Sequence, residues 1–347
     1  MSITRRNLLG TTGAALAVLS APSIVSAQDR TLTVRDPGGP YAAGFKKAFY
    51  DPFLAETGIR VAGVQGEHAP TGMIASMVDA GNYVWDGSIL SDNAHQVLVQ
   101  QNYLAPIGDN SAISDIPSQL RTDYLMGTDV VGVVLAYRTD TMGEGALNSW
   151  ADAYDIQGKP GLRAFRRKAF DTIEQALLAS GVAPADLYPL DFDRAFAKLD
   201  TIRDDVAVWW TGGAQTSQLL ATGEVDVCPT WNARAQVTID DGAPVAINWN
   251  EALYTFEGWG ILRDGPNVDL MREFVAFCAD GERQAKFTDD LAYGPTNPAA
   301  YGFISEERAA VLPSNPSFFD KMVKSDAGFW GKAGDAANER FNAWVLG

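Results

Sequence analysis

An arginine and a glutamate, each beside a hydrophobic strand, are the residues best suited to hold a charged group. Arg234 comes three residues after Trp231 and follows an apolar strand predicted over residues 225–230. Its planar guanidinium can donate two parallel hydrogen bonds to a carboxylate, which lysine cannot do. Glu257 stands at the start of another apolar strand, where an unpaired carboxylate is costly. Glu257 should therefore face a cation, either Arg234 or an ammonium group. The alternative for Arg234 is an ion pair at the surface with Asp240 or Asp241.

Aromatic residues gather in the same part of the chain. Trp210 ends a strand predicted over 206–210, and Tyr254 comes three residues before Glu257. Aromatic rings can enclose an alkyl chain and receive an ammonium group by cation–π contact. Trp210, Trp231 and Tyr254 are therefore candidates for the walls of a site, with core packing as the competing interpretation.

The sequence carries no signature of catalysis or of metal binding. It has no G-x-S-x-G, no H-E-x-x-H and no phosphate-binding glycine loop. The two histidines, His68 and His95, lie in separate segments. We expect a binding protein without cofactor or metal. The enzyme alternative is an exported hydrolase with paired carboxylates such as Asp226 and Glu257.

Alternating strands and helices must position these residues. Strands are predicted over 31–34, 59–64 and 84–90, with helices over 41–55 and 71–80 between them. This order is typical of a parallel α/β sheet, and ligand contacts then come from loops at the carboxyl ends of strands.

A second α/β block begins near residue 149, and the apolar segments 130–137 and 256–262 are expected to cross between the blocks. The predicted fold is α/β with two lobes, each a mostly parallel sheet flanked by helices, and a ligand cleft between the lobes. We expect lobe 1 to comprise residues 28–133 plus 258–300, and lobe 2 residues 134–257 plus 301–347.

Composition excludes two classes of protein. The 347 residues carry 27 Lys and Arg against 43 Asp and Glu, a formal charge of −16. Nucleic-acid binding needs clustered basic residues, so no nucleic-acid partner is expected. No apolar run reaches the roughly 18 residues that span a bilayer, so the protein should not be membrane-embedded.

Residues 1–27 are typical of an export signal. Arg5 and Arg6 precede a short apolar stretch at 13–19, and small residues occupy 25–27. This arrangement fits a twin-arginine signal cleaved after Ala27, which delivers folded protein to the periplasm. An uncleaved membrane anchor is the alternative, and the short apolar stretch disfavours it.

Six segments resemble, in order and spacing, the spermidine/putrescine-binding proteins of bacterial ABC transporters, within the extracellular solute-binding proteins of type one. They are residues 149–152, 223–226, 230–232 and 254–262, the helix that ends at 277–278, and residues 293–298. The resemblance implies two lobes that close on a small solute and deliver it to permease subunits in the membrane. A ligand-presenting accessory of a chemoreceptor would use the same binding chemistry.

The resemblance also implies residue roles. Trp231 would be a wall of the pocket, Glu257 the acceptor of an amine, and Tyr293 a pocket tyrosine. The segment after the third strand would face the ligand through Ser91 and Asp92. Asp36 begins the segment that replaces an aromatic-rich stretch of the polyamine binders.

Two departures from the polyamine binders bear on the ligand. Basic residues at 166–168 stand where those proteins place acids, and Arg234 adds a positive group. A subgroup that binds 4-aminobutyrate is similar, with an arginine three residues after the pocket tryptophan and an acid on the crossing strand, as in Trp231, Arg234 and Glu257. The hypothesis is a zwitterionic ω-amino acid such as 4-aminobutyrate, with putrescine or spermidine as the near alternative.

Cys228 and Cys278 lie 50 residues apart, and a disulfide is permitted in an exported protein. Spacing alone does not decide between a disulfide and two free thiols, because geometry does.

Overall fold

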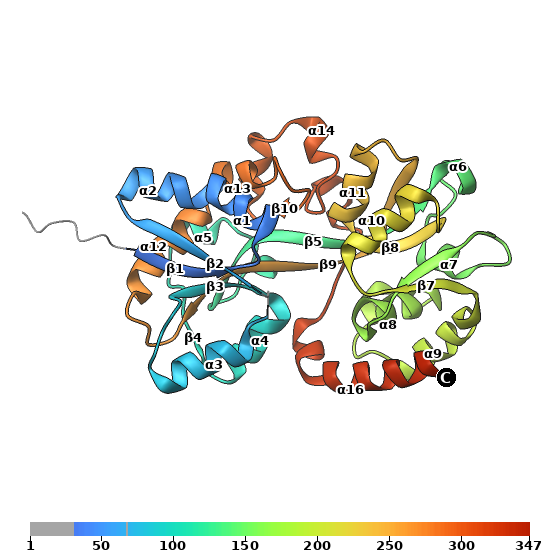
Figure 1. Ribbon diagram of the computed structural model, residues 1–347, viewed down its shortest axis with the longest axis horizontal. Coiled ribbons are helices and arrows are strands. Elements are labelled where there is room, and N and C mark those ends of the chain that lie inside the picture. The colour runs from blue at the N-terminus through green and yellow to red at the C-terminus, as the bar shows by residue number, and fades with distance from the viewer. Residues whose placement is uncertain (1–30, 67–68) are drawn as a thin grey trace, which may run out of the picture.

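The computed structural model describes residues 31–66 and 69–347, which form two α/β lobes side by side (Figure 1). The predicted export signal lies outside the described residues. One 11-stranded sheet runs through both lobes in the order β2-β1-β3-β9-β5-β8-β6-β7, and β4, β10 and β11 pair onto β5 or β9. The strands span Thr31–Asp36 (β1), Arg60–Gln65 (β2), Gly87–Ser91 (β3), Leu104–Ala105 (β4), Leu125–Arg138 (β5), Arg163–Arg166 (β6), Val206–Trp210 (β7), Val227–Trp231 (β8), Val245–Leu262 (β9), Gly294–Pro295 (β10) and Val323–Lys324 (β11).

Helices cover the sheet in both lobes (Figure 1). In the half that holds β1 to β3 they span Gly39–Phe45 (α1), Asp51–Thr57 (α2), Thr71–Ala80 (α3), Asp92–Gln100 (α4), Ser111–Ser114 (α5), Val268–Cys278 (α12) and Gly281–Phe287 (α13). In the half that holds β6 to β8 they span Thr139–Met142 (α6), Trp150–Tyr154 (α7), Ala169–Ala179 (α8), Phe192–Asp200 (α9), Gly213–Thr222 (α10) and Asn232–Asp240 (α11). The last part of the chain adds Glu306–Ala309 (α14), Pro316–Phe319 (α15) and Ala327–Leu346 (α16). A π-helical turn over Lys46–Tyr50 joins α1 to α2, and short 3-10 turns cover Ser118–Leu120, Pro184–Asp186, Arg203–Asp205 and Pro298–Gly302.

Two long strands, β5 and β9, connect the lobes. They pair antiparallel along their length, from Leu125 opposite Gly260 to Arg138 opposite Val245. Within the lobes, β1 pairs parallel with β2 and β3, and β6 pairs parallel with β7 and β8. The predicted two-lobed α/β class is therefore confirmed. The segment predicted to cross over 256–262 is the last part of the longer strand β9, which begins at Val245.

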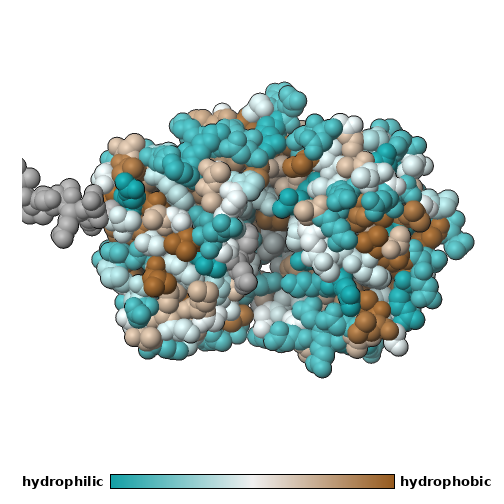
Figure 2. All heavy atoms as spheres, in the orientation of Figure 1, coloured by the Kyte–Doolittle hydropathy of each residue, from teal (hydrophilic) through white to brown (hydrophobic). Residues whose placement is uncertain are grey.

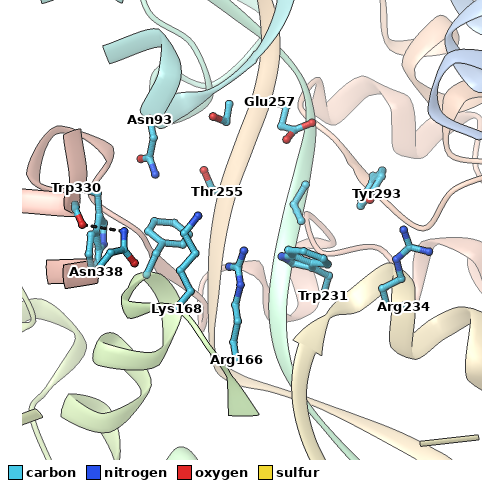
Figure 3. Close-up of a pocket in the computed structure, with 14 residues that line it drawn as sticks. Asn93, Arg166, Lys168, Trp231, Arg234, Thr255, Glu257, Tyr293, Trp330 and Asn338 are labelled. Atoms are coloured by element: carbon cyan, nitrogen blue, oxygen red, sulfur yellow. Dashed lines mark hydrogen bonds between the residues drawn. The ribbon is translucent and has the colours of Figure 1, made fainter. Parts of the chain in front are cut away.

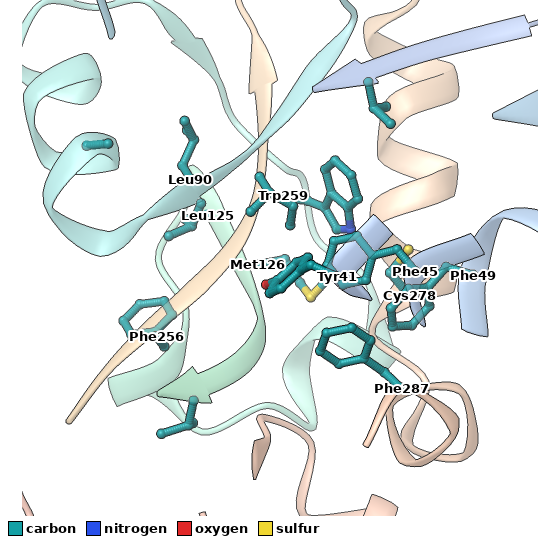
Figure 4. Close-up of a cluster of buried hydrophobic side chains, with 14 of the residues drawn as sticks. Tyr41, Phe45, Phe49, Leu90, Leu125, Met126, Phe256, Trp259, Cys278 and Phe287 are labelled. Atoms are coloured by element: carbon teal, nitrogen blue, oxygen red, sulfur yellow. The ribbon is translucent and has the colours of Figure 1, made fainter. Parts of the chain in front are cut away.

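An aromatic cluster fixes β9 in the first lobe (Figure 4). Phe45 packs against Phe287 and Trp259, with ring centroids 4.8 and 5.4 Å apart. Phe49 completes this side of the cluster, and Phe45, Phe49 and Trp259 are each fully buried. Burying such side chains contributes roughly 1.5–3 kcal/mol each, so the strand that carries Glu257 is firmly held.

The long helix α16 contacts both halves of the molecule. It packs against α8 in the second lobe and against α4 in the first (Figure 1). Its residues Trp330, Gly334 and Asn338 follow one another at a spacing of four and all line the cavity described below.

The structure has both cysteines as free, fully buried thiols. Cys228 lies in β8 and Cys278 ends α12, so they belong to opposite halves of the molecule. The disulfide that the sequence left open is not formed.

Candidate binding site

A cavity of about 450 Å³ lies between the lobes, where the molecular surface is hollowed (Figures 2 and 3). Its size falls within the range of roughly 300–1,000 Å³ that small-molecule sites occupy. Residues from both lobes and from the crossing strands line it: Ser91, Asn93, Val131, Arg166, Lys168, Phe170, Trp231, Arg234, Thr255, Glu257, Tyr293, Trp330, Gly334 and Asn338.

Five residues singled out from the sequence meet in this cavity. Trp231 ends β8 and Arg234 lies in the first turn of α11, while Glu257 projects from β9. Tyr293 reaches the cavity just before β10, and Ser91 does so at the end of β3. Ser91 also caps α4, since its hydroxyl accepts a hydrogen bond from the amide of the third helical residue.

Four other predicted residues lie outside the cavity lining. Trp210 is buried behind Trp231, with ring centroids 5.7 Å apart. The ring of Tyr254 packs on α15. Asp36 is buried and accepts a hydrogen bond of 2.9 Å from the hydroxyl of Tyr50, which ends the π-helical turn between α1 and α2.

Asp92, the fourth, points away from the cavity although its neighbours Ser91 and Asn93 line it. Its carboxylate is buried, 3.4 Å from Nδ1 of His95 and 3.8 Å from Nζ of Lys324. Adjacent residues in the first turn of a helix face different directions, which separates Asp92 from Asn93.

The sequence reasoning missed several lining residues. Arg166 ends β6, Lys168 lies in the connection that follows, and Phe170 lies at the start of α8. All three are near the carboxyl end of a parallel strand, which is the same signal that identified Trp231. Trp330 and Asn338 come from α16, and their helical spacing on one face was the available signal.

Trp231 forms a central wall of the cavity, between Arg166 and Arg234 (Figure 3). The guanidinium carbon of Arg166 lies 4.9 Å from the centroid of the Trp231 ring, which is cation–π distance. Gly213 permits this position, because a Cβ there would come within 2.6 Å of the ring and 3.0 Å of Nε of Arg234. The absence of a side chain at Gly213 thus makes room for the wall.

Asn232 holds this wall in register with the opposite strand. Its Oδ1 accepts a hydrogen bond of 3.0 Å from the amide of Gly132 in β5. Its Nδ2 donates to the carbonyl of Ala292, next to Tyr293. The fully buried amide therefore ties β8, β5 and the Tyr293 segment together and positions Trp231 and Tyr293.

Glu257 is joined to a second carboxylate through a tyrosine. The hydroxyl of Tyr41 donates to Asp129 and lies 3.2 Å from Oε2 of Glu257. Burial, followed by these two carboxylates, raises the pKa of Tyr41 well above its usual value. Burial and then Glu257 also raise the pKa of Tyr293, while Arg234 lowers it, so the Tyr293 hydroxyl lies within the fields of both charged residues.

A buried ion pair holds Arg166. Its Nη1 donates to Oδ2 of Asp171, whose side chain is 1% exposed. Burial raises the pKa of Asp171, and the attraction to Arg166 opposes that rise. Burial and then the nearby guanidinium of Arg166 lower the pKa of Lys168.

A protonatable group lies behind the cavity wall. Oε1 of Glu174 accepts hydrogen bonds of 2.6 Å from Nε1 of Trp330 and 2.8 Å from the hydroxyl of Tyr188. Burial, aided by the charge of Asp171, raises the pKa of Glu174 to about 8. The carboxyl group therefore supports Trp330 from behind, in a predominantly protonated form at neutral pH.

The paired carboxylates of the enzyme alternative do not meet. Asp226 binds the amide of Leu162 next to β8, where Val227 pairs with Tyr137. Glu257 pairs with Asp129 of the same strand β5. Asp129 and Tyr137 are eight residues apart, or roughly 26 Å at the rise of a strand, so the two carboxylates are far from each other. In the part of the chain that the structure describes, no cluster of three metal-ligating side chains occurs. No helix among the same residues combines the length and hydrophobicity of a membrane span.

Comparison with known proteins agrees with this geometry. A family described as bacterial extracellular solute-binding protein matches residues 48–315. The gamma-aminobutyric acid-binding protein of Pseudomonas aeruginosa is 32% identical over 338 residues, which cover 94% of each chain. A substrate-binding protein of an ABC transporter from Bradyrhizobium japonicum shares 34% identity at a TM-score of 0.84, over 91% of this chain and 99% of that one. The Atu4243-GABA receptor shares 30% identity at a TM-score of 0.82, over 91% and 98%. The chain therefore belongs to the bacterial extracellular solute-binding proteins, a family of binding proteins rather than enzymes.

Proposed function

We propose that this protein captures an ω-amino acid of the 4-aminobutyrate type and delivers it to the permease of an ABC transporter. The observation that carries the proposal is that Arg234 and Glu257 face one cavity, with the aromatic wall of Trp231 beside them (Figure 3). The carboxylate of the solute would pair with Arg234 and its ammonium group with Glu257. The methylene chain between them would lie on the ring of Trp231.

The charges around the cavity favour this solute over a polyamine. Among the described residues that line the cavity, Glu257 is the single acidic side chain, whereas Arg166, Lys168 and Arg234 are basic. A diamine would place its second ammonium group against a basic residue, and like charges at close range are repulsive. The relatives that are described as binding gamma-aminobutyric acid support the same choice.

The proposal includes the cellular setting and the motion. Residues 1–27 would be a twin-arginine signal, cleaved after Ala27 to release a periplasmic protein. Lobe 1, residues 28–133 plus 258–300, and lobe 2, residues 134–257 plus 301–347, would close on the solute by bending of β5 and β9. Closure excludes water from the charged contacts and so strengthens them.

The test is isothermal titration calorimetry of the purified mature protein with four solutes: 4-aminobutyrate, 5-aminovalerate, butyrate and putrescine. We expect an ω-amino acid to bind most tightly, because butyrate leaves Glu257 without its ammonium partner and putrescine leaves Arg234 without a carboxylate. Loss of one charge-assisted contact weakens binding about tenfold or more.

Two variants separate the poles of the site. Glu257→Gln should weaken 4-aminobutyrate but not butyrate, and Glu273→Gln, on the exposed face of α12, is the matched control. If Arg234→Ala abolished binding while Glu257→Gln bound 4-aminobutyrate like wild type, the amine half of the proposal would be wrong. If putrescine bound and every ω-amino acid did not, the whole assignment would be overturned.

A further inference from the structure

The cavity has a second basic region that one carboxylate does not use. Arg166 and Lys168 enter it from the β6–α8 connection, on the opposite side of Trp231 from Arg234 (Figure 3). The ring of Trp231 therefore separates two positively charged places. An ω-amino acid bound between Arg234 and Glu257 would bring no anionic group to the place formed by Arg166 and Lys168.

The basic side chains of this region are only partly neutralised by the protein. Arg166 donates to Asp171 through Nη1. Within residues 31–66 and 69–347, its Nε and Nη2 make no further hydrogen bond, and Lys168 forms no ion pair. Burial, and after it the charge of Arg166, lowers the pKa of Lys168, so holding the two cations side by side in the cavity is unfavourable. An anionic group between them would relieve that cost.

The surroundings favour a carboxylate there rather than a hydrophobic group. Asn93 and Asn338 line the same side of the cavity (Figure 3). The amide of Asn93 can donate to a ligand, whereas Nδ2 of Asn338 already donates to the carbonyl of Gly334 and has one N–H left. The stacking of Arg166 on Trp231, at 4.9 Å, and its ion pair with Asp171 fix the orientation of the guanidinium. A pre-oriented guanidinium binds a carboxylate with little loss of side-chain entropy.

Resting on the proposed function, we infer that Arg166 and Lys168 form a second carboxylate subsite, so that the preferred solute is an amine flanked by two acidic arms. Its ammonium group would meet Glu257, one carboxylate would meet Arg234, and the other would meet Arg166 and Lys168. The class is that of secondary-amine dicarboxylic acids. A simple ω-amino acid would fill two of the three positions.

The experiment compares two probes by calorimetry: 4-aminobutyrate and N-(carboxymethyl)-4-aminobutyrate, which adds one acidic arm to the same amine. We expect the added arm to tighten binding about tenfold or more, the effect of one charge-assisted hydrogen bond. Glutarate, which has two carboxylates and no amine, tests whether the amine matters.

Two variants locate the subsite, one of a lysine that lines it and one of a neighbouring arginine that does not. Lys168→Met should reduce the affinity ratio of the two probes at least fivefold, and Arg167→Met should leave this ratio unchanged. Arg167 is the matched control because it is adjacent, basic and exposed, and does not line the cavity. The ratio isolates the pairwise effect, since changes common to both probes cancel.

The possible results separate the two proposals. If both probes bound equally, or if Lys168→Met kept the full advantage of the second arm, the subsite would be refuted while 4-aminobutyrate binding stood. If glutarate bound tightly and neither amine probe did, the assignment of Glu257 to an amine would fail, and both proposals with it.

Discussion

Gly213 gives a sharp test of how the cavity wall is positioned. A Cβ at this residue would lie 2.6 Å from Cζ3 of Trp231 and 3.0 Å from Nε of Arg234. Since carbon atoms pack at roughly 3.5–4.0 Å, the Gly213→Ala variant must displace the ring or the start of α10 by about 1 Å. Overpacking of this kind costs about 1–3 kcal/mol.

Both sides of the site should respond, because the added methyl group lies between the wall and the arginine. We expect the affinity for the bound solute to fall at least tenfold, or about 1.4 kcal/mol, in titration calorimetry. The free energy of unfolding should change less, because alanine improves the helix by up to about 1 kcal/mol and so offsets part of the overlap. The near-ultraviolet circular dichroism of the tryptophans should change as the ring moves.

Gly212 supplies the control. A Cβ there has no neighbour within 4 Å, and the residue has an ordinary extended conformation with φ of −134°. Gly212→Ala should therefore keep wild-type affinity, at a cost of less than about 1 kcal/mol for a poorer helix cap. If Gly213→Ala bound the solute as well as Gly212→Ala did, Trp231 and Arg234 would not be held as described.

Three further predictions concern the groups around the cavity. The pKa of Glu174 is raised to about 8, so the folded protein holds a proton that the unfolded chain releases above its ordinary pKa of 4.5. The stabilisation from this proton is complete below pH 4.5 and is lost as the pH rises to about 8, by at most about 1.4 kcal/mol per pH unit. In urea melts, the free energy of unfolding of Glu174→Gln should therefore depend less on pH than that of the wild type. Asn232→Ala should destabilise the protein by about 2–4 kcal/mol, because two buried backbone groups lose their partner; a loss below 1 kcal/mol in urea melts would contradict this role. Arg166→Met should cost about 3–5 kcal/mol by stranding the buried charge of Asp171, and the double variant with Asp171→Asn should recover part of that loss. If the loss of the double variant equalled the sum of the two single losses in urea melts, the pair would not be coupled.

Local sequence patterns were sufficient for the architecture. The helix predicted over 71–80 has those bounds in the structure, and the apolar run at 130–137 lies within β5. Both features depend on neighbouring residues, whose hydrophobic spacing is visible in the sequence. Trp231, Arg234 and Glu257 were identifiable for a related reason, since they come at strand ends or where a charge interrupts an apolar segment.

The remaining cavity residues depend on contacts between distant segments. Trp330 reaches the cavity because α16 packs across both lobes, and no local pattern in the sequence encodes that packing. Asp36 and Asp92 are polar residues at strand ends, as expected of ligand contacts, but neither lines the cavity, and each contacts neighbours within the protein. Which of two adjacent polar residues faces a cavity is decided by the three-dimensional packing of the helix that carries them.

The pairing of β5 with β9 has a consequence for how the chain is made. β9 is the neighbour of β3 in one lobe and of β5 throughout, and it ends at Leu262. Until the ribosome has released that residue, the edges of β3 and β5 carry unpaired amide and carbonyl groups, which are templates for aggregation. Neither lobe can be completed from a contiguous first half of the chain. Folding must therefore wait for late synthesis, and fragments that end before β9 should be bound by chaperones or degraded rather than accumulate as a folded single lobe.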